Sequence, residues 1–361
     1  MTRADALVDS SSVASVEALC LRQTLRADDF NLSNVDIYIN SRCNRRCAYC
    51  FLPDEFFATR QQISIEVADA IISWCQGAIR EVTLLGGEPS LHPRIADIAE
   101  LVASSGLNLR VVTNGSPPFR KLLNHRSFIR CLRSVAVSLD HFEADAACTL
   151  RGRGAFDDAM HTIRRLTQLN VPVAVNCTVT SLLADRISEM IGFVEKLGAF
   201  RLNLHWLSSV GRARARPDLV VSTERWRAVL DTLIEYRPAR PDYEVDCEVG
   251  WIYPDLKDLV DPFECAVRAR TNLQFMPDGR VFSCGLLVES EQLHGYEWRD
   301  GVLHSRIHSQ TEVVIADDAA CSTCPIRNAL NEYQTGDNRE LSPACIYQRA
   351  RPRGFKATQY K

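Results

Sequence analysis

The sequence predicts an α/β protein: a partial (β/α)6 barrel of the TIM-barrel type, followed by a smaller cysteine-rich domain. Three observations predict this architecture. Short β-rich segments alternate with segments of helical periodicity six times over about 200 residues, which is typical of parallel strands with helices packed outside. Six units are two fewer than a closed barrel contains. The alternation then stops at the stretch 237–241, beyond which cysteine, proline and glycine cluster.

Strands are expected where short runs of β-branched and other apolar residues meet turn residues. The second run ends in Gly86-Gly87, the third in Thr113-Asn114-Gly115 and the fourth at Asp140. In chain order, the expected strands are 35–39, 82–85, 109–112, 135–139, 173–179 and 202–206.

Helices are expected between these strands, where apolar residues recur at helical spacing. In 64–76, the residues Ile65, Ala68, Ile72 and Cys75 fall on one face. The expected helices are 64–76, 95–103, 121–132, 156–169, 187–197 and 224–236. The predicted domains are an N-terminal segment 1–32 with a possible helix, the barrel 33–240 and a C-terminal domain 241–361. Functional groups should lie at the carboxyl ends of the strands.

Composition narrows the class of protein. The chain has 361 residues, 46% of them hydrophobic, and a formal net charge of -3, which favours neither a nucleic-acid partner nor a membrane surface. The N-terminus lacks the apolar core of a signal peptide, and we find no apolar run of ~18 residues. A cytoplasmic location is therefore expected, and the 14 cysteines should be thiols or metal ligands.

The first expected strand is followed by Cys43, Cys47 and Cys50, in a C-x3-C-x2-C spacing. Three thiolates this close together can surround a polynuclear iron–sulfur cluster and leave one iron open for another ligand. A zinc loop or three incidental thiols are the alternatives.

Further candidates follow the later strands. Gly86 and Gly87 permit close approach of a ligand to the backbone, and the Glu88 carboxylate offers a partner to an ammonium group. Asn114 lies in the Thr-Asn-Gly turn, which a helix entry would also explain. The guanidinium of Arg151 suits a carboxylate ligand.

Four other residues have open roles. Asp140 is expected to cap the following segment. Asn176 is either a ligand contact or a satisfied buried amide. His205, near the expected barrel mouth, is expected to be structural. Cys247 is either a hydrogen-atom donor to a substrate radical or a buried spare thiol.

The cysteine segment, with Tyr49 as the aromatic residue of Cys-x3-Cys-x-aromatic-Cys, resembles the radical S-adenosylmethionine (SAM) enzymes. The resemblance implies a 4Fe–4S cluster held by the three cysteines, with SAM on its open iron. It implies that Glu88 receives the SAM amino group, in a Gly-Gly-Glu-Pro motif. It also places Ser138 and Arg151 at the SAM ribose and carboxylate.

The C-terminal region holds a second group of cysteines around a hairpin signal at 278–280. The spacing is compatible with zinc or an iron–sulfur cluster. It resembles the twitch or SPASM domains of radical SAM enzymes, which hold auxiliary 4Fe–4S clusters. One auxiliary cluster is expected, with Cys345 as an alternative ligand. Its four expected ligands are Cys265, Cys284, Cys321 and Cys324.

The resemblance implies a radical SAM oxidoreductase in natural-product biosynthesis. Cleavage of SAM would give a 5′-deoxyadenosyl radical that takes a hydrogen atom from the substrate. The expected substrate is a ribosomally made peptide, and the expected partner is an electron donor such as flavodoxin or ferredoxin. The alternatives are a dehydrogenase or epimerase of an amino sugar or aminocyclitol and, from another class, a non-catalytic zinc-binding interaction protein.

Overall fold

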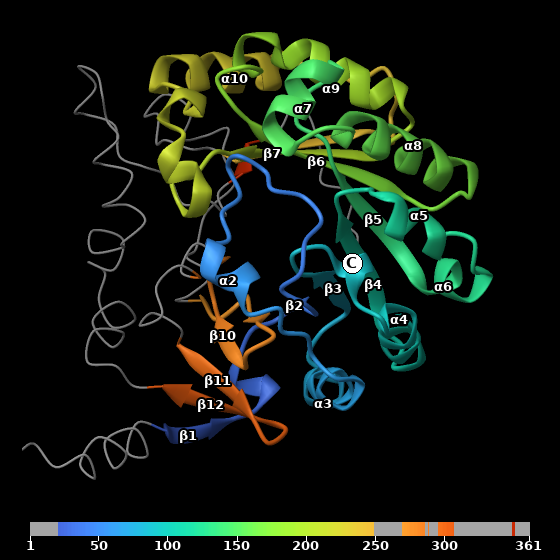
Figure 1. Ribbon diagram of the computed structural model, residues 1–361, viewed down its shortest axis with the longest axis vertical. Helices are drawn as coiled ribbons and strands as arrows, with labels where there is room; N and C mark the ends of the chain where they lie inside the picture. Colours follow the sequence, from blue (N-terminus) through green and yellow to red (C-terminus); the bar gives the residue numbers. More distant parts are fainter. Residues whose placement is uncertain (1–20, 249–268, 286–287, 289–294, 307–348, 351–361) are drawn as a thin grey trace, which may run out of the picture.

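One sheet runs through the computed structural model, which describes residues 21–248, 269–285, 288, 295–306 and 349–350. It has 13 strands in the order β1-β12-β11-β10-β9-β2-β3-β4-β5-β6-β7-β8-β13. Helices cover the outer face of its parallel part (Figure 1). Antiparallel strands extend the sheet beyond β9 at one end, and β13 pairs antiparallel with β8 at the other. The sheet and its helices confirm the predicted α/β class.

The parallel part begins at β2 and continues strand by strand to β8. Its strands are β2 (Asn34–Tyr38), β3 (Glu81–Leu85), β4 (Asn108–Thr113), β5 (Leu132–Ser138), β6 (Val173–Val179), β7 (Arg201–Trp206) and β8 (Glu244–Glu248). The six expected strands correspond to β2–β7. The sequence analysis missed β8, which pairs in parallel with β7 through Leu204 and Cys247. Cys247 therefore lies inside the sheet and not after it.

The helices agree with the expected segments, with one exception. The segment 121–132 is split between two short helices, α5 (Pro117–Leu122) and α6 (Arg126–Cys131). Two further helices, α2 (Asp54–Ala58) and α7 (Ala144–Arg151), were not expected. The helices are α2 (Asp54–Ala58), α3 (Ile65–Cys75), α4 (Ile95–Ser104), α5 (Pro117–Leu122), α6 (Arg126–Cys131), α7 (Ala144–Arg151), α8 (Ala155–Gln168), α9 (Ile187–Lys196) and α10 (Thr223–Glu235). Among the described helices, none is both long and apolar enough to cross a bilayer.

The two faces of the parallel strands differ in polarity. On β6, Val175 and Cys177 are fully buried in the main core, whereas Asn176 and Thr178 line a cavity on the other face. Side chains alternate between the faces of a strand, so the neighbouring strands repeat this division. Apolar residues thus pack against the helices, and polar residues face the concave side, where a polar ligand could be held.

The C-terminal strands extend the same sheet. The signal at 278–280 is confirmed as a hairpin, because β9 (Gln274–Phe275) and β10 (Arg280–Phe282) pair antiparallel around it. The strands β11 (Tyr296–Arg299) and β12 (Val302–Arg306) follow, and β13 is Arg349–Ala350. On the other side, β9 pairs in parallel with β2. The segment β1 (Leu21–Leu25), within the expected N-terminal segment, is a strand that pairs with β12.

Candidate active site

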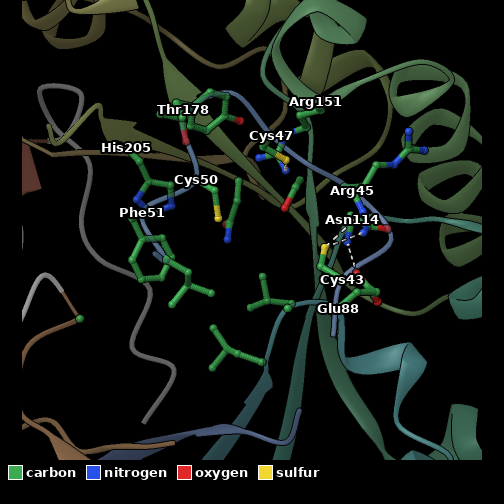
Figure 2. A pocket seen from close by; sticks show the side chains of 18 of the residues that line it. Cys43, Arg45, Cys47, Cys50, Phe51, Glu88, Asn114, Arg151, Thr178 and His205 are labelled. Atoms are coloured by element: carbon green, nitrogen blue, oxygen red, sulfur yellow. Dashed lines mark hydrogen bonds between the residues drawn. The ribbon is translucent and has the colours of Figure 1, made fainter. Parts of the chain in front are cut away.

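A cavity of about 410 Å³ opens where the carboxyl ends of the parallel strands meet. Figure 2 shows side chains from the loop after β2 and from the ends of the later strands around this cavity. This is the edge at which ligands bind in α/β folds. The cavity brings together Cys43, Cys47, Tyr49, Cys50, Gly86, Gly87, Glu88, Asn114, Ser138 and Arg151, all of which the sequence analysis had singled out.

The three cysteines of the loop share the wall of this cavity. Cys43, Cys47 and Cys50 are free thiols and partly exposed. Burial raises the pKa of Cys43 to about 12 and that of Cys50 to about 11. These thiols therefore stay protonated near neutral pH until a metal displaces the proton.

The donor set, three thiols around one cavity, is compatible with a polynuclear cluster. Within the described ranges, no three His, Cys, Asp or Glu side chains are grouped so that they could hold one metal ion. Three thiolates spread around one cavity match a 4Fe–4S cluster, in which each thiolate binds a different iron.

The glycines after β3 allow two backbone segments to meet. The Gly87 N–H donates to Asn40 O at 2.9 Å, and the Glu88 N–H donates to Arg42 O at 2.7 Å. A Cβ at Gly86 would lie 2.5 Å from Asn40 O, and one at Gly87 would lie 2.3 Å from Arg42 O. The sequence analysis had explained these glycines by close approach of a ligand. The structure shows that the cysteine loop itself makes this approach.

Glu88 is buried at the wall of the cavity, and its carboxylate joins two strand ends. It accepts hydrogen bonds from the hydroxyls of Ser90 at 2.6 Å and Thr113 at 2.8 Å. It also accepts one from the Asn114 N–H at 2.8 Å, and the Asn114 side chain in turn donates to Asn44 at 2.9 Å. Burial raises the pKa of Glu88, against the effect of these donors. The turn after β4 is thereby tied to the cysteine loop.

Asp140 organises the opposite wall. This carboxylate is fully buried and accepts hydrogen bonds from the Tyr49 hydroxyl, the Arg151 guanidinium and, at 2.8 Å, the Thr178 N–H. The guanidinium also lies 5.6 Å from the centre of the Tyr49 ring, and its Nη1 lies 3.8 Å from Cys47 Sγ. Burial raises the pKa of Tyr49 well above its usual value, so the hydroxyl remains a donor.

The expectation that Asp140 caps the following segment is wrong. The next helix, α7, begins after Glu143, and the Asp140 side chain points instead to Arg151 at the end of that helix. The pairing joins residues 11 positions apart, which no local sequence pattern indicates. Arg151 and Ser138, the last residue of β5, both line the cavity where the family resemblance placed the SAM carboxylate and ribose.

A third set of polar residues lies on β6, β7 and β8. The Asn176 amide lines the cavity and accepts a hydrogen bond from Asn203 at 2.8 Å. His205 also lines it, and its Nδ1 lies 2.9 Å from a carboxylate oxygen of Glu248. The other Glu248 oxygen accepts from the Trp206 N–H at 2.7 Å. The sequence analysis missed Glu248, although the alternation of 244–248 could have indicated a strand.

Cys247 lies apart from these groups. Its side chain is fully buried in the main core, and it is not one of the described residues that line the cavity. Its position therefore indicates a packing role. Of the expected auxiliary ligands, Cys284 is buried after β10. The others lie outside the described residues: Cys265, Cys321, Cys324 and Cys345.

A comparison of the sequence with protein families matches the segment that contains the cysteine loop. Residues 37–192 match the family model described as the Radical SAM superfamily. This segment of the chain is similar to radical SAM domains. It contains the cysteine loop and the strand ends from β3 to β6, which form most of the cavity wall.

The names of the similar proteins describe different reactions. Sporulation killing factor maturation protein SkfB of Bacillus subtilis is 27% identical over 49% of this chain, which spans 43% of that protein. The AdoMet-dependent heme synthase of Methanosarcina barkeri is 24% identical over 86% of this chain and 95% of that protein. The solved structure of Streptococcus suis SuiB bound to precursor peptide SuiA has a TM-score of 0.60 at 16% identity, covering 86% of this chain and 69% of that one. The last similarity establishes the fold alone.

Proposed function

We propose that the protein is a radical SAM oxidoreductase that matures a ribosomally made peptide. The observation that carries the proposal is the position of Cys43, Cys47 and Cys50 around one cavity inside a segment similar to radical SAM domains. A 4Fe–4S cluster at these thiols would supply one electron to SAM, giving methionine and a 5′-deoxyadenosyl radical that takes a hydrogen atom from the substrate.

The side chains around the cavity would hold SAM. Glu88 and Asn114 form one wall, and Glu88 is the proposed partner of the SAM amino group. Ser138 and Arg151 stand across the cavity, toward the ribose and carboxylate. Arg151 is held by Asp140, and its Nη1 is turned toward Cys47. A guanidinium fixed in this way loses little freedom when it binds a carboxylate.

One auxiliary 4Fe–4S cluster is proposed beside the barrel, with Cys284 as the ligand that lies in the described part of the chain. Cys265, Cys321 and Cys324 would complete it, and Cys345 is the alternative. Such a cluster would accept an electron from the substrate radical. The holoprotein should then contain about eight irons, four from each cluster.

The peptide substrate is supported by the names of two similar proteins. SkfB is a maturation protein, and the SuiB structure contains a precursor peptide. A small-molecule substrate is the second candidate, because the heme synthase matches most of this chain and nearly all of its own length. A synthetic precursor peptide encoded beside the gene distinguishes the two. Turnover that changes its mass supports maturation, and 5′-deoxyadenosine formed without any change in the peptide favours the second candidate.

The radical SAM activity is tested with protein purified anaerobically and reduced with dithionite. We expect 5′-deoxyadenosine from the wild type, and at least about a hundredfold less from Cys43→Ala, Cys47→Ala or Cys50→Ala, because three ligands are needed to hold the cluster. The matched control is Cys131→Ala, a partly exposed thiol on α6 that should retain activity. A colourless, zinc-loaded protein would contradict the proposal.

A further inference from the structure

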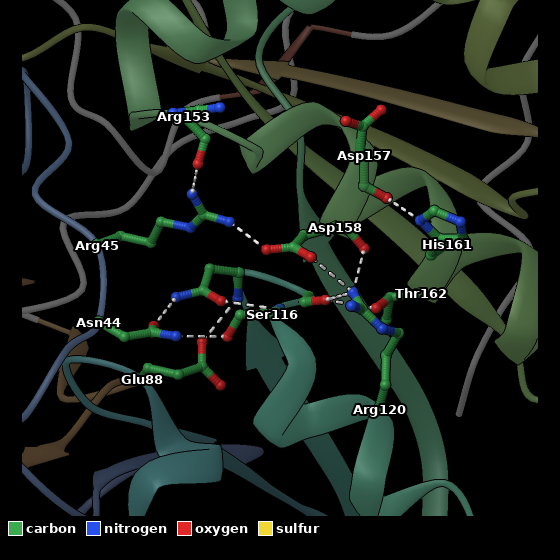
Figure 3. A network of polar contacts seen from close by, with 12 residues as sticks. Asn44, Arg45, Glu88, Ser116, Arg120, Arg153, Asp157, Asp158, His161 and Thr162 are labelled. Atoms are coloured by element: carbon green, nitrogen blue, oxygen red, sulfur yellow. Dashed lines mark hydrogen bonds and ion pairs between the residues drawn. The ribbon is translucent and has the colours of Figure 1, made fainter.

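The first half of the cysteine loop carries an ion pair that the proposed chemistry does not use. Arg45 lies two residues after Cys43, and its guanidinium donates to the Asp158 carboxylate near the start of α8. The guanidinium also donates to the Arg153 carbonyl at 2.6 Å. Figure 3 shows the Arg45 side chain reaching from the loop to both partners. The ion pair thus joins the loop to a helix whose residue is 113 positions away in the sequence.

This ion pair is largely shielded from solvent. The side chain of Arg45 is 10% exposed, and that of Asp158 is 18% exposed. Ion pairs on the surface are screened by water and salt, and burial reduces this screening. Arg45 also lines the cavity, and its backbone N–H donates to Cys43 Sγ at 3.4 Å. A change in either charge should therefore act on the cysteine ligands with little screening.

The carboxylate of Asp158 is shared between two arginines. Its second oxygen accepts a hydrogen bond from Arg120 of α5 at 2.9 Å. Arg120 also donates to the Gly115 carbonyl at 3.0 Å, in the turn after β4. One carboxylate thus pairs with two guanidinium groups, and its removal would leave both without this partner.

The backbone beside Cys43 is held by neutral contacts as well. The Asn44 side chain donates to the Ser116 hydroxyl at 2.9 Å. It accepts a hydrogen bond from the Asn114 side chain, also at 2.9 Å. These contacts involve neither Arg45 nor Asp158. Replacement of Asp158 by asparagine should therefore change the charge near the cysteines more than it changes the path of the loop.

We propose that Asp158 is a positioning residue for the cluster and acts through Arg45, an inference that rests on the proposed function. Its carboxylate holds the guanidinium beside the first half of the loop and balances the positive charge. The pair thereby contributes to the reduction potential of the cluster, which depends on the charges around it. A reduced cluster carries one more negative charge than an oxidised one, so a nearby carboxylate disfavours reduction and a nearby guanidinium favours it.

The test measures the reduction potential of the reconstituted cluster without SAM, by a redox titration followed with electron paramagnetic resonance. For Asp158→Asn, we expect the equilibrium constant for reduction to rise about threefold or more, which is about 30 mV for one electron. For Arg45→Gln, we expect it to fall by a similar factor. The double variant lacks both charges and should lie within about twofold of the wild type. A loop that is only loosened would shift both single variants in the same direction.

The matched control is Asp157→Asn, which removes the same charge from the same turn of α8. The Asp157 side chain is exposed, and Figure 3 shows it pointing away from Arg45. Its removal should shift the potential less than half as much, because water and salt screen an exposed charge. Shifts of the same sign in Asp158→Asn and Arg45→Gln would overturn the proposal. A shift in the control as large as that in Asp158→Asn would overturn it too.

A second measurement decides the proposal if a variant binds no cluster. Urea unfolding of the proteins as purified gives a double-mutant cycle for Arg45→Gln and Asp158→Asn. We expect the two changes to depart from additivity by about threefold or more in the unfolding equilibrium constant. Additive effects would mean that Asp158 does not hold Arg45, and the proposal would fall. Absence of an iron–sulfur cluster from the wild type would instead contradict the proposed function, and the unfolding cycle would still decide the pairing.

Discussion

The carboxylate of Asp140 is fully buried, and three parts of the chain supply its hydrogen-bond donors. The cysteine loop contributes Tyr49, helix α7 contributes Arg151, and β6 contributes the Thr178 N–H. A buried ion pair of this kind adds little stability over an apolar pair, but removal of one partner leaves an uncompensated charge. The carboxylate is therefore best understood as the group that fixes Arg151 and the loop around the cavity.

At the residue scale, we predict that Asp140→Ala lowers the free energy of unfolding by about 3–5 kcal/mol, because the Arg151 guanidinium loses its buried partner. Asp140→Asn should cost less, since an amide still accepts a hydrogen bond. The comparison is Asp242→Ala, which removes an exposed partner of Arg240 and should change stability little. Urea titrations measure all three. If Asp140→Ala and Asp242→Ala lower the free energy of unfolding equally, Asp140 does not fix Arg151 and the cysteine loop.

At the scale of elements, a 3-10 turn secures the far end of the cysteine loop. The turn Gly211–Ala215 follows β7, and the Arg212 N–H donates to Cys50 O at 2.9 Å. Gly211 has a φ of 60°. A Cβ there would lie 2.3 Å from Cys50 O, so only glycine permits this approach without a shift of the loop. The turn and the segment after β3 thus hold the loop from two sides.

We therefore expect Gly211→Ala to displace the Cys50 end of the loop. Backbone strain and overlap should cost about 1–3 kcal/mol in stability, and iron bound per chain after reconstitution should fall. Gly192→Ala is the matched control, because nothing lies within 4 Å of its added Cβ and alanine favours the helix α9. Iron assays and thermal unfolding check both variants. Full iron content in Gly211→Ala would show that the close contact between Gly211 and Cys50 O is not needed to hold the loop.

The elements also show what local sequence can and cannot predict. The strand β6 was expected with the same bounds that it has, because every residue of this segment except Asn176 is apolar or β-branched. The strand β8 was missed because Glu244, Asp246 and Glu248 interrupt its apolar residues. Their partners, Arg201 and His205, lie on β7, more than 40 positions away. Polar groups on a concave sheet face are satisfied across strands, and a local pattern does not reveal such pairs.

At the scale of the whole molecule, aromatic side chains join the barrel to the C-terminal strands. Trp74 on α3 packs edge-on against Phe275 of β9 at 6.1 Å and Trp298 of β11 at 5.9 Å. Its indole N–H donates to Leu25 O of β1 at 3.1 Å. The sequence analysis placed a domain boundary at 240, since composition changes there. The sheet itself continues across that position, through contacts between residues more than 200 positions apart.

This continuity predicts energetic coupling between the barrel and the C-terminal strands. In a double-mutant cycle of Trp74→Leu and Trp298→Leu, we expect an interaction energy of about 0.5–1.5 kcal/mol, the value of an edge-to-face aromatic pair. The control cycle combines Trp298→Leu with Trp226→Leu, a fully buried residue of α10 on another part of the barrel, and should be additive within about 0.5 kcal/mol. Both cycles rest on urea unfolding followed by circular dichroism. Two separate transitions, or additivity in the first cycle, would mean that the C-terminal strands fold independently of the barrel.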